Sequence, residues 1–214
     1  MPADRNGLSW PPGIDEPMPF IANSAQAPAV PSGPLVTLVY RVDPERTSVG
    51  FEVSQLGLFM QSGRFGHANG RIIYDADAES GGVDLTVDTA TVNTGWELRD
   101  TFVRGEDMLD AARYPKLEFR STSMSFAGHK LVGVDGALTL RGVTRPVRFE
   151  VRDVQCGASA GEGGERCSAE IVGRISRHDF GIDYGYPLVG DEVLLTFAVS
   201  ALRQRDAEVS ASRP

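Results

Sequence analysis

The sequence predicts an all-β fold built from antiparallel strands. Apolar and polar residues alternate with a period of two in many segments, such as 83–88 (VDLTVD) and 193–200 (VLLTFAVS). Such alternation gives each strand one apolar and one solvated face, which is typical of antiparallel sheets. Glycine, aspartate and asparagine separate the runs, and helix-like patterns are rare.

The strands are expected in nine segments, the first of them a short edge. They are 35–42, 47–55, 64–76, 82–92, 116–126, 130–141, 145–155, 168–177 and 191–202. Helix-like pieces near 96–104 and 106–112 interrupt the alternation with a charged insert. Pro115 lacks an amide donor and biases Tyr114 toward an extended conformation, so the insert ends there. Many short strands with few helices fit either a sandwich or a barrel.

The sheet is expected to form a single domain at 35–202. Residues 1–34 contain prolines too closely spaced for regular structure, so they are expected to form an extended or disordered leader. Residues 203–214 form a polar tail. The start of the sequence lacks the basic and apolar regions of a signal peptide, although Ala25-Gln26-Ala27 has the form of a cleavage site. No apolar run is long enough for a transmembrane segment.

The net charge of −8 and the isoelectric point near 4.9 argue against nucleic acid as a partner. Cys156 and Cys167 flank a glycine-rich segment and have no zinc-finger spacing. They form either a disulfide that closes a hairpin or two free thiols. A disulfide would indicate an oxidising, exported location.

Six motifs in co-linear order over about 38–202 resemble those of the YceI-like family of lipid-binding proteins. They are Tyr40-Arg41-Val42-Asp43-Pro44 with 48–53 (SVGFEV), 63–66 with 70–75 (GRFG and GRIIYD), 92–95 with 99–111 (VNTG and RDTFVRGEDMLDA), Tyr114-Pro115 with 119–122, 136–147 (GALTLRGVTRPV), and 177–182 (RHDFGI). The sequence departs from the family where its members often carry histidine: Thr47 and Phe102 stand at two such positions, and Gln55 at or near the third. The roles of those histidines are therefore not carried over.

The resemblance implies an extended, lipocalin-like antiparallel β-barrel of about eight strands, with the short helical insert near 96–112. It also implies a periplasmic or secreted protein that carries a long-chain amphipathic lipid, most often a polyisoprenoid. The bound molecule would be an isoprenoid or a fatty-acid-like lipid, with no cofactor, and family members can form homodimers.

The inward-facing apolar residues either line a tunnel for such a lipid or simply pack a core. The predicted tunnel residues are Phe51, Val53, Phe65, Ile73, Leu85, Val87, Trp96, Met108, Leu109, Phe119, Leu138, Phe149, Phe180 and Phe197. Arg99 and Arg104 are either part of a solvated, salt-bridged lid at the barrel mouth or contacts for an anionic head group. An i,i+4 pair of Arg104 with Asp100 would tie this helix.

No catalytic or metal-binding motif is recognised. His67, His129 and His178 are scattered along the chain, and neighbours within 176–179 (SRHD) alternate faces on a strand, which excludes a triad. Two other hypotheses remain open. One is an isomerase or hydrolase that acts on a small apolar substrate in the same pocket, and the other is an interaction module with a filled core.

Overall fold

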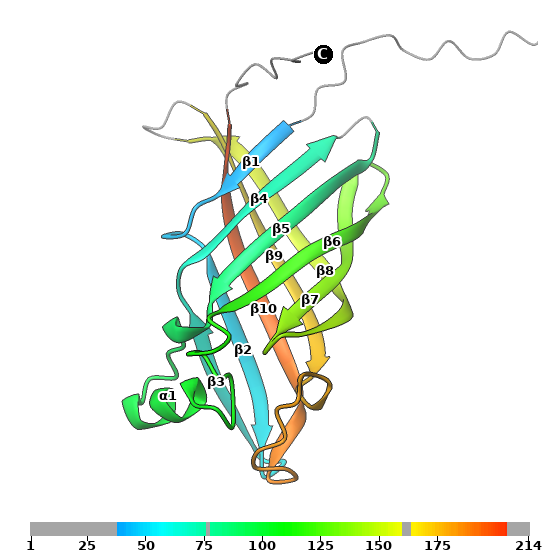
Figure 1. Ribbon diagram of the computed structural model, residues 1–214. Helices are drawn as coiled ribbons and strands as arrows, with labels where there is room; N and C mark the ends of the chain where they lie inside the picture. Colours follow the sequence, from blue (N-terminus) through cyan, green and yellow to red (C-terminus); the bar gives the residue numbers. More distant parts are fainter. Residues whose placement is uncertain (1–37, 76–77, 160–163, 205–214) are drawn as a thin grey trace, which may run out of the picture. The chain divides into compact units, whose positions relative to one another are not determined.

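The computed structural model describes residues 38–75, 78–159 and 164–204. The leader predicted at 1–34 and most of the tail predicted at 203–214 lie outside these residues. The described part is an antiparallel β-barrel, as expected, and its order of elements is shown in Figure 1. The sandwich alternative is wrong, because the first and last strands pair with each other and close the sheet.

The sheet has 10 strands. They are β1 (Leu38–Val42), β2 (Ser48–Gln55), β3 (Phe59–Phe65), β4 (Ala68–Asp75), β5 (Ser80–Asp88), β6 (Lys116–Ala127), β7 (Lys130–Leu140), β8 (Val143–Ala158), β9 (Glu165–Ser176) and β10 (Val189–Arg203). Helix α1 (Glu97–Arg104) and two short 3-10 turns, η1 (Thr89–Thr91) and η2 (His178–Phe180), lie between strands.

Eight of these strands form the closed barrel, in the order β1-β4-β5-β6-β7-β8-β9-β10, and β10 returns to β1. Strand β10 pairs with β1 through Ala201–Arg203 and with β2 through Val189–Ala198. Strands β1 and β2 thus follow one another along the same edge of β10. Buried Thr47 lies between β1 and β2 and holds this connection against β10, because its Oγ1 accepts a hydrogen bond from Ser200 N at 3.1 Å.

Strand β3 was not predicted as a separate strand. Its sequence, FMQSGRF, lacks a clear alternation, and most of its side chains are exposed or half-buried. It pairs with β2 and lies outside the eight strands that close the barrel. Because this edge strand has no continuous core beneath it, its apolar and polar residues do not alternate.

Helix α1 forms within the predicted insert. Glu97 and Asp100 in its first turn and Arg104 in its last complement the helix dipole, and Gly105 follows its end. Residues 106–112 form hydrogen-bonded turns where a second helical piece was expected. Arg104 pairs with Glu97 at 2.8 Å, and not with Asp100 as predicted, because Asp100 is turned inward to Thr94.

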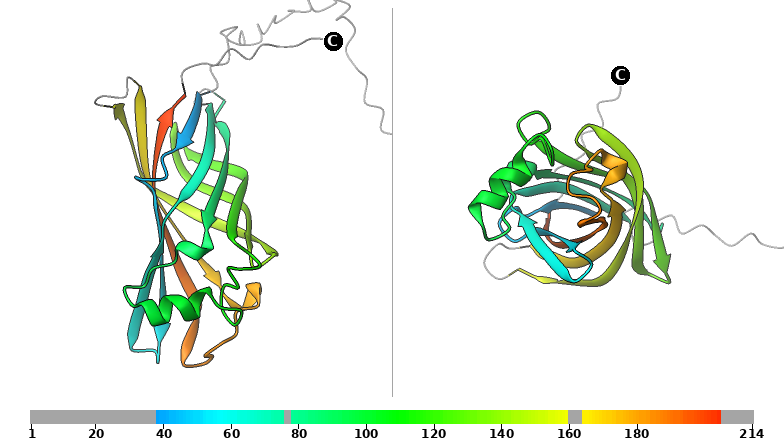
Figure 2. Two further views of the ribbon diagram at one scale, coloured as in Figure 1. Left: turned by 60° about the vertical axis from the view of Figure 1, so that its left-hand side comes forward. Right: turned by 90° about the horizontal axis from the view of Figure 1, so that it is seen from below.

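The barrel has two distinct ends (Figures 1 and 2). The α1 end is formed by the β2–β3, β5–β6, β7–β8 and β9–β10 connections. At the opposite end, called here the open end, β4, β6 and β8 finish and β5, β7 and β9 begin. The predicted lid therefore lies at the α1 end and not at the open end.

Three carboxylates accept hydrogen bonds at positions far apart in the barrel, and each has a lowered pKa. Asp43 accepts a hydrogen bond from Arg166 at 2.8 Å, which holds the pKa of Asp43 below its usual value. Hydrogen bonds from Thr94 lower the pKa of Asp100 in the same way. Burial alone would raise the pKa of Asp191, but hydrogen bonds from His178 N and Ser176 Oγ outweigh it, and the pKa is lowered.

These shifts predict acid-induced destabilisation. A carboxylate with a lowered pKa in the folded state stabilises the protein above its unfolded pKa of about 4. That contribution is lost as the pH falls through the lower folded value. The melting temperature is expected to be level just above pH 4 and to fall below it, with a smaller fall in Asp43→Asn than in the native chain. Calorimetry between about pH 2 and pH 7 checks this, and equal acid dependence in the two proteins would contradict it.

Candidate ligand-binding cavity

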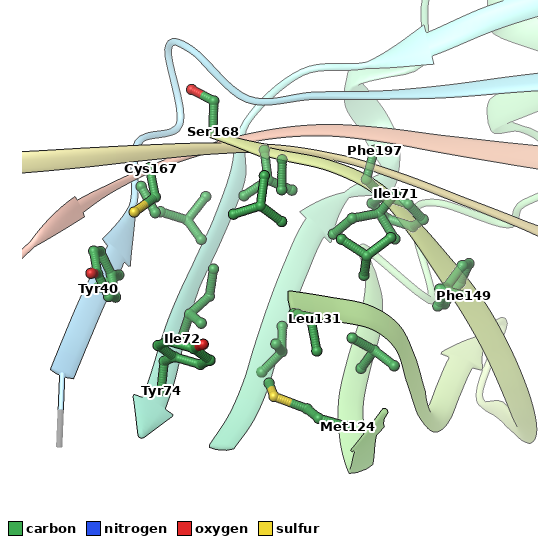
Figure 3. Close-up of a pocket in the computed structure, with 18 of the residues that line it drawn as sticks. Tyr40, Ile72, Tyr74, Met124, Leu131, Phe149, Cys167, Ser168, Ile171 and Phe197 are labelled. Atoms are coloured by element: carbon green, nitrogen blue, oxygen red, sulfur yellow. The ribbon is translucent and has the colours of Figure 1, made fainter. Parts of the chain in front are cut away.

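A cavity of about 610 Å³ occupies the half of the barrel toward the open end (Figure 3). Its lining comes from β1 and from β4 to β10, so every strand of the closed barrel contributes. The lining residues are Tyr40, Val42, Ile72, Tyr74, Val83, Leu85, Phe119, Met124, Ala127, His129, Lys130, Leu131, Val134, Phe149, Val151, Val154, Cys156, Cys167, Ser168, Ala169, Ile171, Phe197, Val199 and Ala201. A concave, mostly apolar site of this size is typical of small-molecule binding.

The polar groups of the lining gather near the mouth. Tyr40 donates a hydrogen bond to Glu165 Oε2 at 3.0 Å, and burial together with this contact raises the pKa of Tyr40 to about 12. Tyr74 donates to the carbonyl oxygen of His129 at 3.4 Å. His129 and Lys130 lie in or beside the β6–β7 turn and are exposed. No carboxylate appears among the described residues of the lining, and apolar side chains such as those of Val134, Phe149 and Ile171 form the deep wall.

The depth of the cavity is set by three aromatic rings. Phe119 and Phe149 meet edge to face with ring centroids 5.1 Å apart, and Phe149 meets Phe197 in the same way at 5.1 Å. Beyond them toward the α1 end, the interior is filled by a packed core that includes Val49, Leu138 and Phe180. The barrel is therefore hollow in one half and solid in the other.

Only some of the predicted tunnel residues line this cavity. Leu85, Phe119, Phe149 and Phe197 do. Others pack in or against the core outside the cavity: Phe51, Phe65, Val87, Met108, Leu109, Leu138 and Phe180. Alternation predicts which face of the sheet a side chain occupies, but it carries no information about depth along the barrel axis.

The three remaining tunnel candidates lie elsewhere. Val53 is half-buried on β2, beside the closed barrel, and Trp96 is 58% exposed at the start of α1. Ile73 stands on the other face of β4, because its neighbours Ile72 and Tyr74 are the ones that line the cavity. Because two isoleucines follow each other in this strand, the sequence did not show which of them faces the inside of the barrel.

The structure places neither predicted head-group arginine at the cavity mouth. Arg99 lies at the α1 end, where its guanidinium donates to Thr94 Oγ1 at 2.8 Å, to the Thr94 carbonyl at 2.6 Å and to Gln61 Oε1. Arg104 pairs with Glu97 on the same helix. Both cations thus anchor the insert to itself and to β3.

Cys156 and Cys167 are joined in a disulfide, and both line the cavity. They face each other in register on β8 and β9, so the bond links adjacent strands near the open end. Among the described residues, these cysteines and Glu165 have the proximity of metal ligands. The disulfide occupies both sulfurs, which leaves the group without thiolates.

A polar cluster at the α1 end contains serine, histidine and aspartate. Asp191 Oδ1 accepts a hydrogen bond from Ser176 Oγ at 2.9 Å and lies 2.8 Å from His178 Nδ1. The aspartate therefore stands between the other two, whereas a nucleophilic triad requires the histidine in the middle. The arrangement stabilises the β9–β10 connection.

Buried Arg177 organises that connection, and sequence reasoning assigned it no role. Its guanidinium donates to four backbone carbonyls, those of Gly190, Ile182, Tyr184 and Val189, at 2.7 or 2.8 Å. Burial lowers its pKa from the usual value. These contacts hold in place the segment that carries Phe180 and Ile182 into the core of the α1 end.

Comparisons with known proteins agree with this architecture. The chain is 32% identical over 177 residues to Protein YceI of Escherichia coli O157:H7, covering 81% of this chain and 92% of that protein. The structure resembles that of BcnA of Burkholderia cenocepacia, with a TM-score of 0.63 and 24% identity over 74% of this chain and 98% of that one.

Two further solved structures share the fold. A Campylobacter jejuni YCEI protein has a TM-score of 0.60 and 25% identity, covering 71% of this chain and 90% of that one. A polyisoprenoid binding domain from Saccharophagus degradans has a TM-score of 0.58 and 19% identity, over 78% and 99% of the respective chains. The sequence model of the YceI-like domain matches residues 40–201. The chain therefore belongs to the YceI-like domain family.

Proposed function

We propose that this protein binds and carries an amphipathic long-chain lipid, with the hydrocarbon tail in the cavity and the head group at the open end. The observation that carries the proposal is the charge-free deep wall of a 610 Å³ cavity inside the barrel. Burial of apolar surface supplies the affinity, at about 0.8 kcal/mol for each methylene. The structural neighbour from Saccharophagus degradans is a polyisoprenoid binding domain, and this likeness favours an isoprenoid as the tail.

The polar rim suits a head group that needs hydrogen bonds. The hydroxyls of Tyr40 and Tyr74 and the ammonium of Lys130 surround the mouth and can contact an alcohol, carboxylate or phosphate. No cofactor enters this proposal. The proposed role is binding without bond-making, and the apolar side chains that form the deep wall of the cavity support it.

Mass spectrometry of lipids extracted from the purified protein tests this function. We expect a long-chain lipid in a ratio approaching one per chain, with the prenyl class favoured. Protein that carries no lipid and fails to take up a fluorescent fatty-acid or prenyl probe would contradict the proposal. Turnover of a small apolar substrate in the cavity would instead support the enzyme hypothesis.

An oxidising compartment, either the periplasm or the extracellular space, is part of the proposal. The Cys156–Cys167 disulfide supports it, because such bonds persist mainly outside the cytosol. No helix among the described residues is long and apolar enough to cross a membrane.

The α1 end carries an apolar surface that supports self-association. Among the described residues, all the exposed large apolar side chains except Val154 lie in three segments of this end. They are Leu56, Leu58, Phe59, Met60, Trp96, Leu98, Phe102, Tyr184, Tyr186 and Leu188. The Phe102 and Tyr184 rings are 4.7 Å apart, and Leu56 N donates to the Leu188 carbonyl at 2.6 Å, so the three segments adjoin.

The size of this surface points to a second copy of the chain. Its five aromatic side chains are 40% to 62% exposed, which leaves on the order of 100 Å² each. With the leucines and methionine, the surface approaches the roughly 800 Å² that each partner buries in a standard interface. It also exceeds the roughly 300–600 Å² patch of a typical monomer.

We expect a homodimer through the α1 end that a double charge substitution separates. Sedimentation of the native chain should give twice its mass of 23.0 kDa. Leu58→Glu combined with Leu188→Glu should give the monomer mass and retain lipid binding, because both residues lie far from the cavity. Ser123→Glu, exposed near the open end, is the control and should stay dimeric. A native monomer would contradict the dimer, and its flotation with neutral phospholipid vesicles would assign the surface to a bilayer.

A further inference from the structure

The cavity ends at a floor made of the rings of Phe119, Phe149 and Phe197. These side chains are only 6%, 2% and 3% exposed. Beneath them Val49 and Leu138 are fully buried, at 0%. A tail that enters at the open end therefore meets packed side chains partway along the barrel.

Two glycines fix the position of this floor. A Cβ atom at Gly173 would lie 2.4 Å from Phe149 Cδ1, and one at Gly136 would lie 2.5 Å from Phe119 Cε2. Each ring thus already lies directly against the backbone of the neighbouring strand. Neither ring can withdraw further toward the wall to lengthen the cavity.

The volume above the floor sets a capacity. If each methylene-sized group takes about 30 Å³, as a water molecule does in the liquid, a cavity of 610 Å³ holds about 20 such groups. A longer tail must leave its remaining carbons at the mouth or in water.

We propose that the barrel limits the length of the lipid tail that it can bury, with about 20 carbon atoms as the upper limit. Phe119, Phe149 and Phe197 determine this limit. The inference rests on the proposed lipid-binding function and adds the length class of the ligand.

Affinity measured along a series of prenyl alcohols of increasing length tests the limit. Displacement of a fluorescent fatty-acid probe gives each dissociation constant. We expect affinity to rise about fourfold for each buried carbon group. Beyond about 20 carbons, further lengthening should change the dissociation constant by less than about twofold. The additional carbons stay in contact with water, so they bury no further apolar surface.

Two substitutions should move the limit in opposite directions. Phe149→Leu removes part of the floor, so affinity should keep rising for a few more carbons. Gly173→Ala forces the Phe149 ring toward the cavity, so the plateau should come at shorter chains. Phe180→Leu is the matched control, because Phe180 is also 2% exposed but lies outside the cavity lining. It should lower stability and leave the limit unchanged.

The outcomes separate this inference from the function on which it rests. An affinity that continues to rise well past the predicted limit, or a limit unmoved in both Phe149→Leu and Gly173→Ala, overturns the length limit while binding stands. Failure to bind any member of the series overturns the proposed function itself. A limit that shifts equally in Phe180→Leu assigns the effect to general loosening of the core and also overturns the inference.

Discussion

Replacing Ala169 by tryptophan is expected to weaken lipid binding by roughly 200-fold. Ala169 lies on β9 in the cavity lining, in register with Val154 and Val199, which also line it. An indole at this position displaces about four methylene groups of the tail, each worth about 0.8 kcal/mol. Probe displacement measures the loss.

The matched control for this substitution is Ala198→Trp. Ala198 is exposed on the outer face of β10 and lies next to Val199 in the sequence. The same side chain added there should leave affinity within a few-fold of the native value. Equal affinity in the native chain and Ala169→Trp, with both folded by circular dichroism, would mean that the tail binds elsewhere.

Replacing Arg177 by methionine is expected to cost on the order of 3 kcal/mol of folding free energy. Four carbonyls lose their donor, and each buried acceptor left unpaired costs about 1–3 kcal/mol. Water that enters and hydrogen-bonds to these carbonyls recovers part of this cost. The melting temperature should fall by roughly 10 °C in a chain of this length. Denaturant titration checks the free energy.

Arg174→Met controls for the loss of a positive charge. Arg174 is exposed and pairs with Glu192 at 3.1 Å, an interaction worth at most about 1 kcal/mol. Its replacement should therefore change stability little. If Arg177→Met proves no more harmful than Arg174→Met, the guanidinium does not hold the β9–β10 connection in place.

Much of the fold could be predicted from the pattern of the sequence. Strict alternation in segments such as 83–88 and 193–200 specified antiparallel strands, and Pro115 marked the end of the insert. Gly190 was expected to precede the last strand, but it lies inside β10. Gly136 lies inside β7, within the strand predicted at 130–141, and glycine is needed there because the Phe119 ring covers it.

The cavity was harder to predict because its position depends on long-range geometry. Phe149 and Phe180 look alike in the sequence, and both are inward and buried, yet one lines the cavity and the other fills the opposite half. Their depth follows from barrel register and from the β9–β10 connection folded inward by Arg177. No local pattern encodes either feature.

The role of the insert depended on the same geometry. The charges of α1 suggested a ligand contact, because arginine matches anionic head groups. In the structure those charges bind Thr94, Gln61 and Glu97 at the end away from the cavity. The candidate head-group contacts are instead Tyr40, Tyr74 and Lys130. Tyr40 and Tyr74 stand in two of the family motifs, but nothing in the sequence indicated that they face a ligand, and Lys130 stands in none of the motifs.

The most direct test of a lipid tail inside the open half of the barrel is anomalous X-ray diffraction from crystals loaded with a long-chain alcohol brominated at its far end. We expect one bromine peak just above the rings of Phe119, Phe149 and Phe197. A peak at the α1 end, or an ordered ligand lying wholly outside the barrel, would contradict it.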